Sequence, residues 1–373
     1  MFGNTNDKIV LPLICAPMSE DDIPVKSNFE TEYRKMKVKR IGFIIICAVA
    51  CVLLAIYAST VGSYPISPME AFDSILDAIL GRTPEDITIY HIVVNLRLPA
   101  IVTALVCGFG LAICGVCMQS MLKNPLADPY TMGISSGAGF GAALAMILGI
   151  ELIGGAGIVT NAFVFSLLPA LVILFLSKFR NATPTMMILC GIALMYLFNA
   201  ATQLFMLIAD PEDLSAVYKW MIGSVDGTSM EEAALILVVA ILGTIYVQYM
   251  SNQLNLMGLG DESAKTLGVD VERKRLIMLM VVTLVAATVV SFTGIIGFIG
   301  LVAPHMVRAI IGTDNRYLIP ASGFFGALLL LVSHLVAMTI AEPLVLPVGV
   351  ITSCIGGPLF LFLILRNSKE VWA

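Results

Sequence analysis

The residues best suited to an interaction lie in one polar stretch, residues 258–275, which reads GLGDESAKTLGVDVERKR. This stretch concentrates charged side chains in a chain that is only 13% charged. Asp261 and Glu262 suit the first turn of a short helix, because the backbone there leaves unpaired N–H groups and a positive dipole end. Gly268 stands where such a helix would end. The pattern indicates either a docking surface for a soluble partner or a solvated connection, and this stretch alone leaves both open.

Few other residues have the spacing of a catalytic or metal site. The sequence contains no GxxxxGK[ST] motif, so the chain has no P-loop with which to hydrolyse ATP. The three histidines, His91, His305 and His334, are far apart and lack metal-ligand spacing. Cys114 and Cys117 form a CxxC motif among small apolar residues, which favours buried thiols over a metal site. These features argue against an enzyme and predict no cofactor or metal bound by the chain.

The elements that must position these residues are membrane spans. The chain is 58% hydrophobic with a mean hydropathy of +0.95, which is typical of an integral membrane protein. Its apolar runs are too long for β-barrel strands and do not alternate, so the spans are predicted to be helices. There is no basic tract that would suit nucleic acid. The predicted helices are therefore expected to lie in a lipid bilayer.

The sequence predicts an all-α polytopic membrane protein. The ten expected spans cover about 41–62, 98–122, 131–150, 153–177, 185–209, 231–251, 275–296, 298–313, 317–341 and 346–365. Residues 1–40 are expected to form a disordered cytoplasmic tail, in which Met36 as well as Met1 could be the true start. Residues 41–366 form the transmembrane domain and 367–373 a second tail. The eighth span is short for a bilayer that needs about 20 residues, so it is expected to be re-entrant or shielded by its neighbours.

A surface helix and a packing face are also predicted between and within these spans. Residues 68–80 have the pattern of an amphipathic surface helix. Gly133, Gly137 and Gly141 are four residues apart and fall on one helix face. Since small residues let helices approach closely in lipid, this face is interpreted as internal packing in preference to a pore wall.

The distribution of lysine and arginine gives an orientation. With ten spans, both termini lie on one side, and only Arg82, Arg97 and Lys219 of the 21 basic residues lie on the other. The 26 acidic residues divide evenly between the sides. Because basic residues collect in the cytoplasm, we expect both termini and the stretch 258–275 to be cytoplasmic in a cell-membrane protein.

Ionisable residues within the spans indicate which energy source could drive transport. His334 falls near the middle of the ninth predicted span, and His305 and Arg308 lie one turn apart in the eighth. Carboxylates are almost missing from the spans, although a carrier driven by protons or sodium usually needs one. A pore driven by a partner is therefore favoured. Two alternatives remain: a proton-coupled secondary transporter that uses His334, and a membrane receptor or scaffold that does not transport.

Six stretches, in order, resemble the FecCD-type permease family of ATP-binding-cassette (ABC) importers. They are LRLPA (96–100), MQSMLKNPLADPYTMGISSGAGFGA (118–142), WMIGS (220–224), NQLNLMGLGDESAKTLGVDVERKR (252–275), GIIGFIGLVAPHMVRAIIGTDNRYLIPAS (294–322) and LPVGVITSCIGGPLFLFLILR (346–366). Together they cover nearly all of 96–366, while residues 1–40 lie outside the resemblance. Members of the family take up iron–siderophores, haem and cobalamin.

The resemblance implies a type II importer permease of ten helices that pairs with a second copy or a close relative. Two cytoplasmic ABC ATPases would use ATP and Mg²⁺, and an extracytoplasmic binding protein would deliver the metal chelate. Arg97 is expected to contact the binding protein, and Thr183, Pro184 and Thr185 to form a cytoplasmic gate. The expected coupling residues for the ATPases are Gly260, Asp261, Glu262, Ser263, Ala264, Lys265, Thr266, Leu267 and Gly268.

The sequence departs from the family pattern on its outer side. The family often reads LRLPR, and Ala100 replaces the second arginine. His334 and Met338 stand where the family often has an aspartate and an arginine, which fits an ion pair replaced as a unit. Val345 and Leu346 stand where a glutamate is common before the tenth span. These departures put the usual arginine–glutamate contact with the binding protein in doubt, and the identity of the chelate and of the paired permease stays open.

Overall fold

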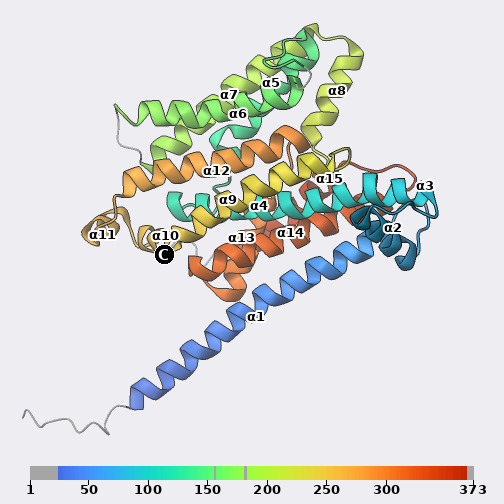
Figure 1. Ribbon diagram of the computed structural model, residues 1–373. Coiled ribbons are helices and arrows are strands. Elements are labelled where there is room, and N and C mark those ends of the chain that lie inside the picture. The colour runs from blue at the N-terminus through green and yellow to red at the C-terminus, as the bar shows by residue number, and fades with distance from the viewer. Residues whose placement is uncertain (1–23, 155–156, 180–182, 368–373) are drawn as a thin grey trace, which may run out of the picture. The chain divides into compact units, whose positions relative to one another are not determined.

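A computed structural model describes residues 24–154, 157–179 and 183–367, and every element in these ranges is helical. The chain divides into two compact units after Lys39. The first helix, α1 (Pro24–Thr60), begins within the tail that the sequence leaves irregular, and residues 1–23 lie outside the described part. The second unit, from Arg40 onward, carries all the features considered below (Figure 1).

Ten helices coincide with the predicted spans. Within the described ranges, seven helices are long and apolar enough to cross a membrane, and three apolar helices are shorter. The spans are α1, α4 (Leu98–Leu122), α5 (Ile134–Leu148), α6 (Gly157–Leu176), α7 (Pro184–Ile208), α9 (Met230–Tyr249), α12 (Val271–Thr293), α13 (Ile299–Ile311), α14 (Asn315–Thr339) and α15 (Val348–Asn367). The all-α membrane fold predicted from the sequence is thereby confirmed.

Helix α4 lies at the centre of the second unit. It packs against α9, α12, α13 and α14, and most of its residues are buried. The thiols of Cys114 and Cys117 belong to this core, and Cys114 Sγ donates a weak hydrogen bond to the Val282 carbonyl oxygen at 3.6 Å. The CxxC motif therefore supplies packing, as its apolar surroundings predict.

Glycines bring helix backbones into direct contact. A Cβ at Gly137 would meet the carbonyl oxygen of Phe165, and one at Gly141 would meet that of Asn161, so both glycines face α6. Gly133 turns the chain before α5 with φ +83° and lies close to the Gly191 carbonyl oxygen of α7. Internal packing is therefore confirmed for these glycines, but the prediction that all three share one helix face is wrong, because Gly133 precedes α5 and faces α7 while Gly137 and Gly141 face α6.

The short helix α13 is enclosed by other helices. At 1.5 Å per residue its 13 residues extend about 20 Å, less than the roughly 30 Å hydrocarbon core of a bilayer. It packs against α4, α14 and α15, and a Cβ at Gly115 of α4 would collide with the Gly300 carbonyl of α13. Neighbouring helices therefore shield the short span, which is how irregular segments persist at membrane depth.

Four further elements lie between the spans at the side opposite α10 and α11. They are α2 (Pro68–Leu80), α3 (Ile87–Tyr90), the π-helical segment η2 (His91–Arg97) and α8 (Pro211–Ile222). Helix α2 has the bounds predicted for the surface helix. It begins at a capping box in which Ser67 and Glu70 satisfy each other's backbone N–H groups, and ends at Gly81 with φ +63°.

Candidate functional site

The polar stretch 258–275 contains one short helix, α11, between the end of α10 and the beginning of α12. Helix α10 (Ser251–Gly258) follows α9, and α11 (Asp261–Thr266) follows Gly260, whose φ of +125° suits glycine alone. Helix α11 ends as predicted, because Gly268 takes φ +85° and its N–H donates to the Lys265 carbonyl oxygen. The chain then enters α12 at Asp270, which caps that helix by accepting from the Arg273 N–H.

Asp261 fastens α11 to the rest of the unit. Both of its carboxylate oxygens accept from Arg275 Nη2, at 3.0 and 2.9 Å, and Oδ1 also lies 2.7 Å from Lys123 Nζ. Arg275 is 1% exposed, and its Nε donates to the Met121 carbonyl oxygen at the end of α4. Burial raises the pKa of Asp261, but the hydrogen bonds and charges of Lys123 and Arg275 outweigh it and lower the pKa overall.

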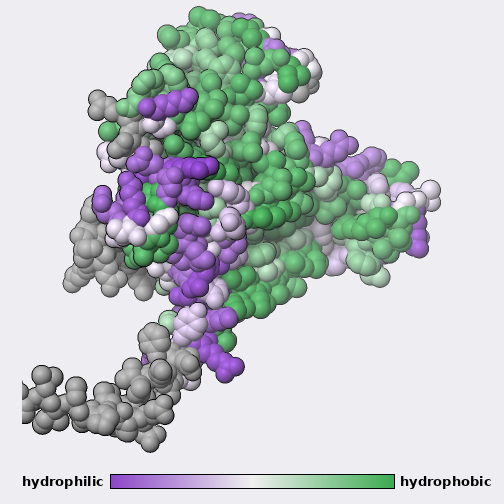
Figure 2. Space-filling view, turned by 60° about the vertical axis from the view of Figure 1, so that its left-hand side comes forward, coloured by the Kyte–Doolittle hydropathy of each residue, from purple (hydrophilic) through white to green (hydrophobic). Residues whose placement is uncertain are grey.

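The other side of α11 faces outward. Ala264 is fully buried beneath the helix, whereas Glu262, Leu259 and Leu267 are exposed, the leucines to 68% and 59%. Figure 2 shows hydrophilic surface gathered on the side turned forward, where α10 and α11 lie, beside broad hydrophobic surface. Exposed apolar side chains rimmed by polar residues can mark a protein interaction site. Because Glu262 and Leu267 belong to the predicted coupling residues and Leu259 lies next to them, we call these three residues the coupling surface.

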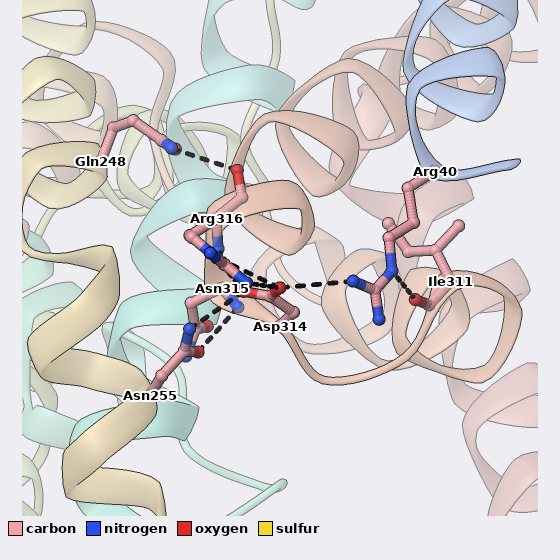
Figure 3. A network of polar contacts seen from close by, with 7 residues as sticks. All are labelled: Arg40, Gln248, Asn255, Ile311, Asp314, Asn315 and Arg316. Atoms are coloured by element: carbon pink, nitrogen blue, oxygen red, sulfur yellow. Dashed lines mark hydrogen bonds and ion pairs between the residues drawn. The ribbon is translucent and has the colours of Figure 1, made fainter. Parts of the chain in front are cut away.

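A second polar network lies beside α10 (Figure 3). Asp314, which caps α14, accepts from Arg316 Nη2 at 2.7 Å and Arg40 Nη1 at 3.3 Å, while Asn255 Nδ2 of α10 donates to it at 2.9 Å. Arg316 is the largest cause that lowers the pKa of Asp314 from 3.8 to about 2, against an opposing effect of burial. This network connects α1, α10 and α14.

The predicted gate residues begin α7. Thr183 is its N-cap, with Oγ1 accepting from the Met186 N–H at 3.2 Å, and Pro184 occupies the first turn. Thr183 and Thr185 are exposed and Pro184 is half-buried. The residues that directly precede them, 180–182, lie outside the described ranges. The gate stays a prediction.

Arg97 lies in a different setting from the outward arginine that the resemblance implies. Its side chain is 6% exposed, with Nη1 donating to the Ser59 carbonyl oxygen at 2.9 Å and Nη2 to that of Tyr64 at 2.6 Å. The guanidinium therefore holds the chain just after α1. In this conformation it presents little surface to a binding protein.

Arg97 lines a pocket of about 570 Å³ together with His334 and Met338 of α14 and Asp226 of the segment before α9. His334 Nδ1 is 3.9 Å from Asp226 Oδ1 and has no hydrogen-bond partner among the described residues. His334 lies in the last two turns of α14, closer to the helix end than the middle of the span where the sequence places it. His334 and Met338 share a helix face, which fits their replacement together.

Several residues of the site could not be predicted from the sequence. Lys123 and Arg275 anchor Asp261, and Arg40 joins Asp314, yet these partners are 138, 14 and 274 positions apart. Leu259 lies just outside the predicted coupling residues. The one signal that could have found the anchor is Arg275 itself, a basic residue at the edge of an apolar run.

Comparisons with known proteins agree with this architecture. Residues 47–366 match the model of the FecCD transport family. An ABC transporter permease protein of Methanocaldococcus jannaschii is 41% identical, with 94% of this chain and all of that protein covered. The family match begins at residue 47, so residues 1–40 lie outside it, as the sequence predicts. A hemin transport system permease protein of Yersinia pestis is 36% identical, with 88% of this chain and 96% of that protein covered.

A solved structure has the same fold. It is described as an inward-facing conformation of a metal-chelate type ABC transporter, and the two superpose with a TM-score of 0.76 at 29% identity. The match covers 87% of this chain and 98% of the other. The ten-helix arrangement is therefore that of an ABC importer permease.

Proposed function

Because this chain belongs to the FecCD transport family, we propose that it is the membrane-spanning subunit of an ATP-driven importer that moves a metal chelate across the cytoplasmic membrane. The hemin permease and the metal-chelate transporter among its relatives support this class of cargo. Within the chain, the observation that carries the proposal is the coupling surface, a short helix fixed from below by Asp261 and presenting leucines outward.

The coupling surface would receive force from a cytoplasmic ATPase, which binds ATP and Mg²⁺ in place of this chain. When the ATPase moves α11, the movement passes through Asp261 to Lys123 and to Arg275, and from Arg275 to the Met121 carbonyl. These contacts lead into α4, the helix around which the unit packs. Charge-assisted hydrogen bonds have a defined geometry, so these contacts would transmit movement of α11 to α4 in either direction.

The remaining partners follow from the family. The permease would pair with a second copy or a homologue and bind two ATPases, with its termini in the cytoplasm as the lysine and arginine distribution indicates. A binding protein would dock on the opposite side. There we propose that Arg97 acts indirectly, by holding the segment from Ser59 to Tyr64, and that Thr183–Thr185 gate the cytoplasmic opening as α7 moves.

Reconstitution tests the proposal. Proteoliposomes that contain the permease, its ATPase and its binding protein would be supplied with haemin, a ferric siderophore or cobalamin. We expect uptake of one chelate that requires ATP and persists when an ionophore collapses the proton gradient. Uptake without the ATPase that stops with the ionophore would instead identify a secondary transporter. Absence of uptake of any chelate by a complex that hydrolyses ATP would contradict an import function.

A further inference from the structure

A second pocket, of about 520 Å³, lies beside α10 on the proposed cytoplasmic side. Its walls come from the Arg40 end of the second unit, the last turn of α4, α10, α13 and the segment before α14. The cationic side chains that line it are Arg40, Lys123 and Arg308, and the carboxylate is Asp314. Three cations against one carboxylate give the pocket a positive charge.

The carboxylates near this pocket are already shared. Asp314 accepts from both Arg40 and Arg316, and Asp261 accepts from Lys123 and Arg275. Two carboxylates therefore pair with four cations, and Arg308 adds a fifth positive charge to this region.

Arg308 is the strongest indication that the pocket binds an anion. Its Nη1 donates at 3.0 Å to Gln119 Oε1, a neutral acceptor, and no carboxylate of the described residues lies within ion-pair distance. Its side chain is only partly accessible. A partly buried guanidinium without a counter-ion is costly, and an anion that enters the pocket would lower that cost.

We propose that this pocket binds the phosphate group of a membrane phospholipid. Guanidinium groups suit phosphate because they donate parallel hydrogen bonds to its oxygens, and Arg308 supplies one such group. Arg40 adds a positive charge beside it, with its Nε donating to the Ile311 carbonyl oxygen and its Nη1 to Asp314. Basic pockets between membrane helices on the cytoplasmic side bind anionic lipid headgroups. The inference depends on the membrane placement of the chain and is independent of the cargo.

The surface next to Arg40 favours a lipid over a free anion or a nucleotide. Directly after Arg40, α1 exposes a run of apolar side chains, which includes Ile41, Ile45, Ile46 and Val49 at 40–67% exposure. An acyl chain can lie along this face while the phosphate occupies the pocket. The described residues that line the pocket include no aromatic side chain on which a nucleotide base could stack.

Native mass spectrometry of the full-length, delipidated protein in detergent tests the site. The probes are phosphatidylglycerol, diacylglycerol with the same chains, and inorganic phosphate. We expect one phosphatidylglycerol per chain, bound about tenfold or more tightly than diacylglycerol. Arg308→Gln and Arg40→Gln should each weaken it about tenfold or more, whereas Arg308→Lys, which keeps the charge, should weaken it less. Lys178→Gln, which removes an exposed charge elsewhere, is the control and should bind like wild type.

Three results would overturn the proposal. The first is equal lipid binding by wild type, Arg308→Gln and Arg40→Gln. The second is diacylglycerol binding as tight as that of phosphatidylglycerol, because the phosphate would then contribute nothing. The third is inorganic phosphate bound as tightly as the lipid, which would identify a free anion as the ligand. If thermal melting shows that Arg308→Gln is not folded, the binding of phosphatidylglycerol by Arg40→Gln and Arg308→Lys tests the proposal instead.

Discussion

Arg275 Nη2 donates to both carboxylate oxygens of Asp261, at 3.0 and 2.9 Å, and thereby ties the beginning of α12 to the beginning of α11. The two residues differ in exposure, since Arg275 is 1% exposed and the Asp261 side chain 32%. Asp261 is therefore held within the unit by ion pairs, whereas its neighbour Glu262 is exposed. The two adjacent acids, which the sequence analysis treats as equivalent, therefore occupy different structural settings.

Asp261→Asn should lower the free energy of unfolding by about 1–3 kcal/mol, because it removes the counter-charge of a buried guanidinium. The partial exposure of Asp261 places the cost below that of a fully buried pair. Chemical unfolding in detergent measures this, with Glu262→Gln as the control. The same variant should reduce chelate uptake per ATP hydrolysed. Equal stability of Asp261→Asn and wild type would contradict the anchoring role.

Leu267→Ser and Leu259→Ser should weaken ATPase binding. Burial of one leucine side chain stabilises an interface by about 1.5–3 kcal/mol, so each variant should bind its ATPase at least about tenfold less tightly. Titration of labelled ATPase onto detergent-solubilised permease provides the measurement. Leu344→Ser is a matched control, because Leu344 is 64% exposed in the segment between α14 and α15. If all three variants bind alike, the coupling surface is assigned to the wrong residues.

The stability of the protein should depend on Asp314 in acid. Its pKa is about 2 in the folded state against an ordinary value of 3.8, so the native state binds fewer protons between these values. The stabilisation is complete above about pH 4 and is lost as the pH falls toward 2. The melting temperature of wild type should exceed that of Asp314→Asn at pH 5, and the gap should narrow by pH 2. Parallel curves for the two proteins would refute this.

Gly115→Ala should destabilise the protein by about 1–3 kcal/mol, because the added methyl group would meet the Gly300 carbonyl oxygen of α13. Gly357→Ala is the matched control, since a Cβ at Gly357 of α15 has no neighbour within 4 Å. Thermal unfolding in detergent compares the two. A Gly115→Ala protein as stable as Gly357→Ala would show that the two helices separate easily.

The sequence predicts the helices well because their causes are local. Long apolar runs require spans in any bilayer, and Ser67, Glu70 and Gly81 mark both ends of α2 by capping chemistry that depends only on neighbouring residues. Asp261, Glu262 and Gly268 locate α11 in the same way. The family could also be predicted, since its motifs recur along the chain in order.

The partners of the charged residues could not be predicted in this way. Which carbonyls Arg97 would meet depends on how the chain after α1 folds back, and the sequence gives no sign that Ser59 and Tyr64 need a donor. Arg40 and Asp314 are brought together only by the packing of α1 against α14. Such contacts follow from tertiary geometry, which composition and periodicity do not encode.

The glycine contacts along α4 have a mechanical consequence. Gly115 lies against Gly300 of α13, and Gly108 lies against Gly326 of α14, with backbone touching backbone at both points. Helices that interlock in this way cannot slide past each other without first separating, which would open a void in the lipid-surrounded core. We therefore expect the three helices to move together as one rigid block, with bending at positions outside it.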